Sequence, residues 1–76
     1  PNPTDGILNL IWTNANFGKG VAWVLDLSGR QLLKKDIDFV NNGTERLDLS
    51  GLNNGLYLIN IKAGTYQYNN MVQVQH

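Results

Sequence analysis

The chain has 76 residues and no cysteine, so it offers room for one domain, which no disulfide stabilises. A chain of this length buries only about 60% of the surface that its unfolded form exposes, and every apolar strand is therefore needed for the core. Six basic and six acidic residues give a formal net charge of zero, which excludes the electrostatic footprint of a domain that binds nucleic acid or an anionic membrane. No apolar run approaches the roughly 20 residues that cross a bilayer and no signal peptide opens the chain, so we expect a soluble piece.

Residues that favour turns are frequent, because 11 Asn, 8 Gly and 2 Pro make up 21 of the 76 residues. This composition predicts many turns and few helices. The chain opens with Pro1-Asn2-Pro3-Thr4-Asp5-Gly6, in which two prolines fix φ and remove backbone donors. We therefore expect a linker segment over residues 1–6 and a strand only from residue 7 onward.

Two strands are predicted in the next part of the chain. Residues 7–13 alternate between the two faces of a strand, and every second side chain from Leu8 to Trp12 is apolar. Residues 14–20 supply side chains that are typical of turns. Residues 21–27 are apolar on both faces with a single exception, which is the pattern of a strand covered on both sides, so we expect a central position.

The middle of the chain is predicted to contain three reversals. Ser28-Gly29 ends the previous strand with a tight turn, and residues 31–40 continue as one bent strand or as two. The segment Asn41-Asn42-Gly43 contains the Asn-Gly pair of two-residue type I′ hairpins, whose central residues must both tolerate positive φ, so we predict a hairpin there. Residues 44–49 alternate again, and Asn53-Asn54-Gly55 predicts the third reversal.

The last part of the chain is predicted to form two strands. Residues 56–62 place alternate side chains from Tyr57 to Ile61 on one face, and Ala63-Gly64 turns the chain. The final stretch, residues 66–75, is polar and rich in side chains that favour β-structure, which indicates an edge strand.

These elements favour an all-β fold without helices. Short strands separated by turns about every 8 to 12 residues are typical of a small antiparallel immunoglobulin-like β-sandwich of about seven short strands, which would span residues 7–75. A small open barrel is the competing architecture, because strand number and turn spacing do not distinguish closure from two packed layers.

Three motifs stand in order along the chain: Pro1-Asn2-Pro3-Thr4-Asp5-Gly6, then Asp26-Leu27-Ser28-Gly29-Arg30, then LDLSGLNNGLY from Leu47 to Tyr57. Together they resemble the C-terminal sorting domain of the type IX secretion system of Bacteroidetes, the Por secretion system type A signal. That family carries P-N-P-T-x-G, D-x-x-G-R and L-D-L-S-x-L-x-x-G-x-Y, and the resemblance covers nearly all 76 residues. The positions that the motifs and the terminal strand mark for recognition are Pro1, Asn2, Pro3, Thr4, Gly6, Asp26, Gly29, Arg30, Leu49, Gly55, Tyr57, Met71, Val72 and Val74.

The resemblance implies a recognition domain that has no catalytic activity and needs no metal or cofactor. The type IX translocon would recognise the folded signal, and an upstream passenger domain would cross from the periplasm through the outer membrane to be secreted or displayed at the cell surface. A sortase-like peptidase would then remove the signal just before Pro1 or further upstream. We expect the isolated domain to be a monomer, with an edge-strand dimer as the alternative, and we expect no direct insertion into a membrane.

The chain departs from the family pattern at two positions and in its tail. Leu25 stands where an aromatic residue usually precedes the Asp of D-x-x-G-R, and Asn70 stands where a lysine usually precedes the last apolar strand. The tail from Met71 to His76 is also less apolar than usual. These differences bear on how efficiently the tail is handled and leave the predicted fold unchanged.

The motif residues have structural interpretations beside the functional one. For the turn at residues 26–30, we expect Gly29 to take positive φ and the Asp26 carboxylate to accept backbone or Arg30 donors, with a translocon contact by Arg30 as the alternative role. Gly55 suits a turn. A tyrosine just after a corner, such as Tyr57, can bury its ring while its hydroxyl bonds to the backbone.

Recognition is predicted at the terminal strand. An edge strand offers backbone groups that a partner can extend by β-augmentation, and the alternative is a strand that only closes the fold. Deleting Met71 to His76 is expected to block export of a fused passenger.

A catalytic role finds little support in the sequence. The only histidine is His76, a residue that could also be a tag remnant, and Ser28 and Ser50 are the only serines, so no Ser-His-Asp arrangement can be held by a scaffold. Asp36 and Asp38 share a strand face, but nothing else in the sequence supplies a metal ligand set or a pocket beside them.

Two other classes of function compete with the sorting signal. A carbohydrate-binding or adhesive sandwich would stack sugars on aromatic side chains, although core packing would also explain these residues. The candidates are Trp12, Trp23, Tyr57, Tyr66 and Tyr68, of which we expect the two tryptophans to pack inside and Tyr66 and Tyr68 to be exposed together. An immunoglobulin-like domain that only spaces other domains is the third hypothesis.

Overall fold

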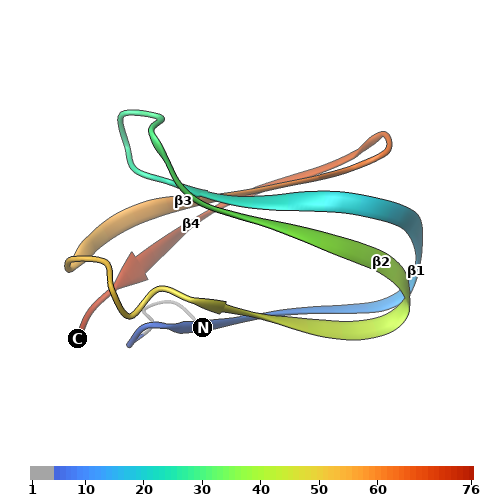
Figure 1. The fold of residues 1–76 in the computed structure, drawn as a ribbon, viewed down its shortest axis with the longest axis horizontal. Coiled ribbons are helices and arrows are strands. Elements are labelled where there is room, and N and C mark those ends of the chain that lie inside the picture. The colour runs from blue at the N-terminus through green and yellow to red at the C-terminus, as the bar shows by residue number, and fades with distance from the viewer. Residues whose placement is uncertain (1–4) are drawn as a thin grey trace.

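The computed structural model describes residues 5–76, and every regular element in this range is a β-strand. The strands are β1 (Ile7–Leu25), β2 (Gln31–Asp48), β3 (Gly55–Ala63) and β4 (Tyr66–Val74). They form one antiparallel sheet in the order β2-β1-β3-β4 (Figure 1). The predicted all-β class is confirmed, but residues 5–76 form four strands instead of about seven. Because this order is linear, with β2 and β4 at its two ends, the sheet is not closed into the barrel that was the alternative.

The difference in strand number arises in the long β1–β2 hairpin, which bends near its middle without ending either strand. Asn14 and Gly18 in β1 and Asn41 in β2 have φ angles of 54°, 73° and 59°, and the pairing register shifts around these positions. Bulges of this kind bend a strand and increase its twist while pairing continues on either side. The Asn14 N–H donates to Asn42 Oδ1 across the bend at 2.7 Å. Figure 1 shows the hairpin curving back over itself.

Two turn predictions are therefore wrong. Residues 14–20 remain within β1, and Asn41-Asn42-Gly43 remains within β2 and forms no hairpin. Both register shifts near the bend add one residue to β1, opposite residues 39–43 of β2, so the ribbon bends while pairing continues and neither strand reverses. Gly43 lies opposite Trp12, and a Cβ at this position would lie 2.4 Å from the Trp12 ring. Glycine is required at position 43 because any side chain there would collide with the Trp12 ring.

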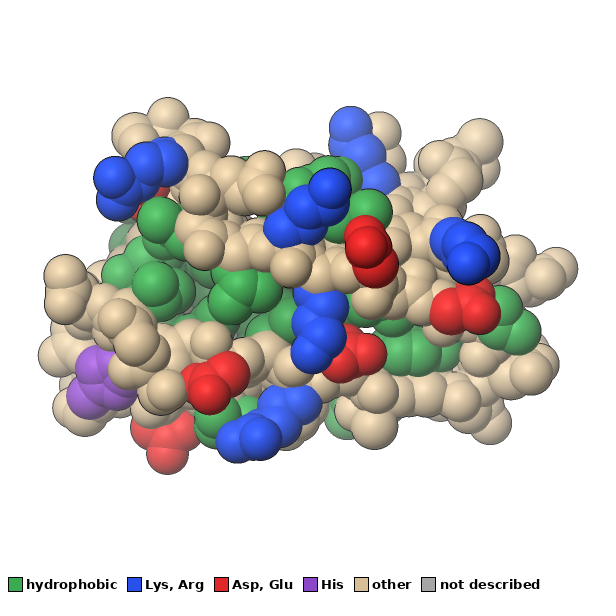
Figure 2. Space-filling view, viewed as in Figure 1, with side chains coloured by type: hydrophobic (Ala, Val, Ile, Leu, Met, Phe, Trp, Pro, Cys, Tyr) green, Lys and Arg blue, Asp and Glu red, His purple; other side chains and the backbone are tan. Residues whose placement is uncertain are grey.

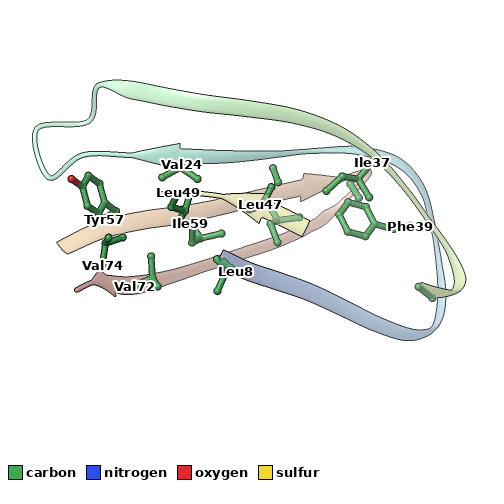
Figure 3. Packing of buried hydrophobic residues seen from close by; sticks show 14 residues of the cluster. Leu8, Val24, Ile37, Phe39, Leu47, Leu49, Tyr57, Ile59, Val72 and Val74 are labelled. Atoms are coloured by element: carbon green, nitrogen blue, oxygen red, sulfur yellow. The ribbon is translucent and has the colours of Figure 1, made fainter. Parts of the chain in front are cut away.

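The bend gives the sheet two layers. The larger layer contains β3, β4 and the parts of β1 and β2 next to the turn at residues 26–30, and β1 pairs with β3 only over residues 21–25. The smaller layer is the two-stranded ribbon of residues 7–12 and 43–48. Figure 3 shows the buried apolar side chains between the layers. They are Leu8, Ala15, Ala22, Val24, Ile37, Phe39, Leu47, Leu49, Tyr57, Ile59, Ile61, Ala63, Val72 and Val74.

The predictions for the second half of the chain are confirmed more closely. The part of β1 after residue 21 is central, since it pairs with β2 on one side and with β3 on the other. Alternate residues of β3 from Tyr57 to Ala63 are buried, and Ala63 pairs with Tyr66 across a tight connection. β4 is the last strand in the order, as expected of an edge strand.

The surface carries charges of both signs. On the face drawn in Figure 2, Lys and Arg side chains alternate with Asp and Glu side chains, without a patch of a single sign. Two ion pairs involve Arg30 with Asp26 and Lys35 with Glu45, at 3.2 and 2.9 Å. Residues 5–76 contain no helix that is long and apolar enough to cross a membrane.

Candidate recognition surface

The turn at residues 26–30 is organised by one carboxylate. Asp26 Oδ1 accepts hydrogen bonds from the Ser28 hydroxyl at 2.6 Å, the Ser28 N–H at 3.0 Å and the Arg30 N–H at 2.9 Å. Gly29 has a φ of 92°, and Arg30 Nε lies 3.2 Å from Asp26 Oδ2. The predicted turn geometry is confirmed. The Arg30 side chain remains 74% exposed, so the guanidinium is held in place and still accessible to a partner.

A second turn repeats this arrangement. Asp48 Oδ1 accepts the Ser50 hydroxyl at 2.6 Å and the Ser50 N–H at 3.0 Å. The tetrapeptide Asp-Leu-Ser-Gly occurs at residues 26–29 and again at 48–51, and this repeat was the sequence signal for a second Asp-centred turn. Leu49 is fully buried, and its N–H donates to the Gly6 carbonyl, which holds the start of the described chain against the connection between β2 and β3.

Asp26 and Asp48 both have a pKa below that of an ordinary aspartate. The pKa of Asp26 is lowered mainly by the hydrogen bond from the Ser28 hydroxyl and then by that from the Arg30 N–H. The pKa of Asp48 is lowered mainly by the Ser50 hydroxyl and then by the Ser50 N–H. Because the folded state lowers these pKa values, the charged carboxylates stabilise the fold above the unfolded pKa of about 3.9. That contribution is lost as the pH falls through the lower folded-state values.

Asp26→Asn is expected to lower the melting temperature at neutral pH, and the difference from the unmodified chain is expected to shrink below about pH 4. Asparagine keeps one acceptor oxygen but loses the charge that faces the turn donors and Arg30. Thermal unfolding followed by circular dichroism from about pH 7 to about pH 2.5 measures this difference. Asp36→Asn, an exposed position on β2, is the control. A difference that stays constant over the whole pH range would contradict the assignment.

Tyr57 forms the predicted tyrosine corner. Its ring is buried, and its hydroxyl donates to the Asn53 carbonyl at 2.7 Å, across the reversal that precedes β3. Gly55 is the first residue of β3 and pairs with Val74, so the corner lies directly beside the end of β4. The hydrogen bond therefore fixes the β2–β3 connection against the start of β3, which pairs with the terminal strand.

Tyr57→Phe is expected to reduce the free energy of unfolding by about 0.5–1.5 kcal/mol, because the Asn53 carbonyl loses its donor while the ring still fills the core. Urea denaturation measures the change. Tyr66→Phe, which removes the hydroxyl of an exposed tyrosine, is the matched control and is expected to have little effect. Equal losses in the two variants would show that the corner hydrogen bond contributes nothing.

The end of the chain docks on the same region. Val72 and Val74 are 4% and 1% exposed, whereas Met71 is 44% exposed on the opposite face of β4. The His76 N–H donates to Asn54 Oδ1 at 3.0 Å, and His76 Nε2 lies 2.7 Å from the Leu52 carbonyl oxygen. His76 therefore contacts the β2–β3 connection.

The predicted recognition residues within the described range thus gather at one end of the molecule, which we call the motif end. It comprises Gly6, the turn at residues 26–30, residues 49–57 and residues 71–76. Figure 1 shows the two connections and the C-terminus on the same side, opposite the bend. Pro1, Asn2, Pro3 and Thr4 lie outside the described residues.

The aromatic residues considered for carbohydrate binding lie in three different places in the fold. Trp12, Tyr66 and Tyr68 line one hollow near the bend, together with Phe17 and Phe39. Trp23 lines a separate hollow, and Tyr57 lies at the motif end. Trp12 and Trp23 are half-buried, whereas Tyr66 and Tyr68 are both exposed, as expected for the pair. The sequence pattern did not mark Phe17, because Phe17 stands among residues 14–20, which were expected to form a turn.

The polar side chains do not assemble into a metal centre within residues 5–76, where no three His, Cys, Asp or Glu side chains come together. Asp36 and Asp38 are exposed on β2.

The turns that carry the sequence motifs and the terminal strand of this small antiparallel domain lie together at one end. Comparison with family models identifies the domain: the secretion system C-terminal sorting domain matches over residues 1–75. The chain belongs to this family, the C-terminal sorting domains of type IX secretion. No curated protein and no solved structure matches the chain.

Proposed function

We propose that the chain directs an upstream passenger through the type IX secretion machinery and across the outer membrane, for release or display at the cell surface. The family match over residues 1–75 is the observation that carries this proposal. In it, the domain acts by binding alone, without metal, cofactor or catalysis. A sortase-like peptidase of the same system removes the domain after export.

The motif end is the surface proposed to meet the translocon. The Asp26 carboxylate holds the Arg30 guanidinium while leaving the side chain 74% exposed, which orders a cation without covering it. The β2–β3 connection and the end of β4 lie beside it, and Met71 adds an exposed apolar side chain. A partner at this end would contact all three chain segments only when the domain is folded.

The test uses residues 1–76 fused behind a Sec signal and a fluorescent passenger, in a Bacteroidetes strain with and without a working type IX system. We expect passenger at the surface or in the medium only when the system works, and its mass should show that the domain has been removed. Periplasmic retention in both strains would contradict the sorting function. Export of a passenger that keeps the domain would contradict its removal.

The role of Arg30 is tested in the same fusion. We expect Arg30→Gln to lower the exported fraction, because the side chain loses the charge offered to the partner. Arg46→Gln changes another exposed arginine, on β2 outside the motif end, and is expected to leave export unchanged. Melting temperatures of the two purified domains show whether each variant is folded. Equal export by both variants would restrict Arg30 to its structural role in the turn.

A further inference from the structure

We propose that the groove between the two layers on the β1 and β4 side binds an uncharged oligosaccharide. This aromatic groove is defined by Asn9, Trp12, Phe17, Tyr66, Tyr68 and Asn70. It lies along strand faces and the bend and uses none of the motif-end turns, and it reaches the proposed sorting surface only at Met71 and Val72.

The groove presents flat aromatic surface to solvent. Phe17 from the bend of β1 and Tyr66 from the start of β4 stack with ring centroids 4.4 Å apart, yet remain 46% and 38% exposed. Trp12 and Phe39 form the deeper part of the groove, edge to face at 5.0 Å. The cavity volume is about 390 Å³, within the range of small-molecule sites. Two stacked rings that are both exposed form a contiguous apolar patch, which in a chain of 76 residues indicates an interaction site.

The polar groups of the groove are all uncharged. No Asp, Glu, Lys, Arg or His of residues 5–76 lines it, whereas Lys62 lines the hollow beside Trp23 and Lys19 and Asp38 line another. The Tyr68 hydroxyl accepts a hydrogen bond from Asn70 Nδ2 at 3.1 Å, which leaves its own hydrogen to donate. An ionic ligand would lose its hydration in this groove without gaining a counter-charge.

A neutral sugar chain matches both features. A pyranose ring has an apolar face, which stacks on aromatic rings, and a rim of hydroxyls, which pair with amide and phenol groups. The cavity also continues along β4, since a second hollow shares Asn9, Leu10 and Tyr68 with the first and extends to Met71. A site of this elongated form accommodates several linked rings, so the ligand class is an oligosaccharide.

The test is a titration of the isotope-labelled chain, residues 1–76, followed by two-dimensional amide NMR. The probes are cellohexaose, xylohexaose and mannohexaose, with oligogalacturonate and a heparin oligosaccharide as anionic comparisons. We expect at least one neutral hexaose to bind, with saturable shifts that centre on the groove residues. No binding by any neutral probe, or binding by the anionic probes alone, would overturn the proposal.

Two variants assign the binding to the ring stack. Tyr66→Ala is expected to weaken binding about tenfold, the equivalent of one lost stacking contact. Tyr66→Leu keeps an apolar side chain but removes the flat ring, so it is expected to lose a similar factor while remaining folded. Leu56→Ala removes a side chain of similar exposure, 44% against 38% for Tyr66, from β3 outside the groove and should bind as the unmodified chain does. Unchanged affinity in both Tyr66 variants would overturn the assignment.

The amide spectra also report a competing occupant. If shifts at Phe17 and Tyr66 depend on protein concentration without any saccharide, a second copy of the chain covers the groove, and the proposal is overturned in favour of self-association. We expect spectra that do not change with protein concentration.

Discussion

Deletion of residues 71–76 is expected to abolish export of a fused passenger and to unfold the domain as well. Val72 and Val74 are buried, and each such side chain contributes about 1.5–3 kcal/mol. The deletion also removes the strand pairing of β4 with the start of β3. A chain of 76 residues has a total stability of about 4–11 kcal/mol, so the loss is a large part of the whole. Fractionation of cells and medium measures export, and circular dichroism of the purified domain measures folding. Normal export of the truncated fusion would contradict the role of the terminal strand.

Loss of export in the deletion does not by itself separate recognition from folding, and a matched pair of substitutions does. Met71 on β4 and Val40 on β2 are 44% and 41% exposed, and Val40 lies near the bend, outside the motif end. Exposed substitutions change stability by about 0.5 kcal/mol or less, so both serine variants should remain folded. We expect Met71→Ser to reduce export and Val40→Ser to leave it unchanged. Equal export by the two variants would mean that β4 contributes to the fold alone.

The second half of the fold follows closely from sequence pattern. Alternation from Tyr57 to Ile61 predicted which side chains of β3 share a face, and these are buried, while Ala63-Gly64 marked the turn before β4. Asp26 and Tyr57 were also placed correctly, because an Asp-centred turn and a tyrosine corner are formed by residues within four positions of each other. Interactions this local leave a signature that a single sequence contains.

The bend of β1 and β2 has no such signature. An Asn-Gly pair at residues 42 and 43 favours a hairpin locally, and only the bulge near Asn14 in β1, 28 residues before Asn42, makes the ribbon bend instead. The same bend places Phe17 against Tyr66, so the aromatic groove could not be predicted either. The turns of the motif end were predicted one by one. Their position together at one end of the molecule could not be predicted, because it depends on the bend that folds the hairpin over.

Gly20→Ala is expected to destabilise the domain by at least about 1–3 kcal/mol. A Cβ at this position would lie 2.5 Å from the Lys62 carbonyl oxygen and 2.7 Å from the Ala63 Cβ, so β1 and β3 would have to separate. The Lys62 obstacle is backbone, which cannot move aside as a flexible side chain does. Since about 1 kcal/mol shifts the melting temperature of a domain this size by about 4–8 °C, the effect is readily measured by thermal unfolding.

Gly51→Ala is the matched control for this prediction. No atom lies within 4 Å of the position of its Cβ, and Gly51 does not have positive φ, so the substitution is expected to change stability by no more than about 0.5 kcal/mol. Gly20 requires no left-handed backbone either, so the contrast isolates the close approach of β1 to β3. A melting temperature for Gly20→Ala equal to that of Gly51→Ala would mean that β3 shifts freely away from β1. In that case, the contact of Gly20 with Lys62 and Ala63 would not be needed to hold β1 against β3. The pairing of residues 21–25 with β3 would then hold the larger layer together alone.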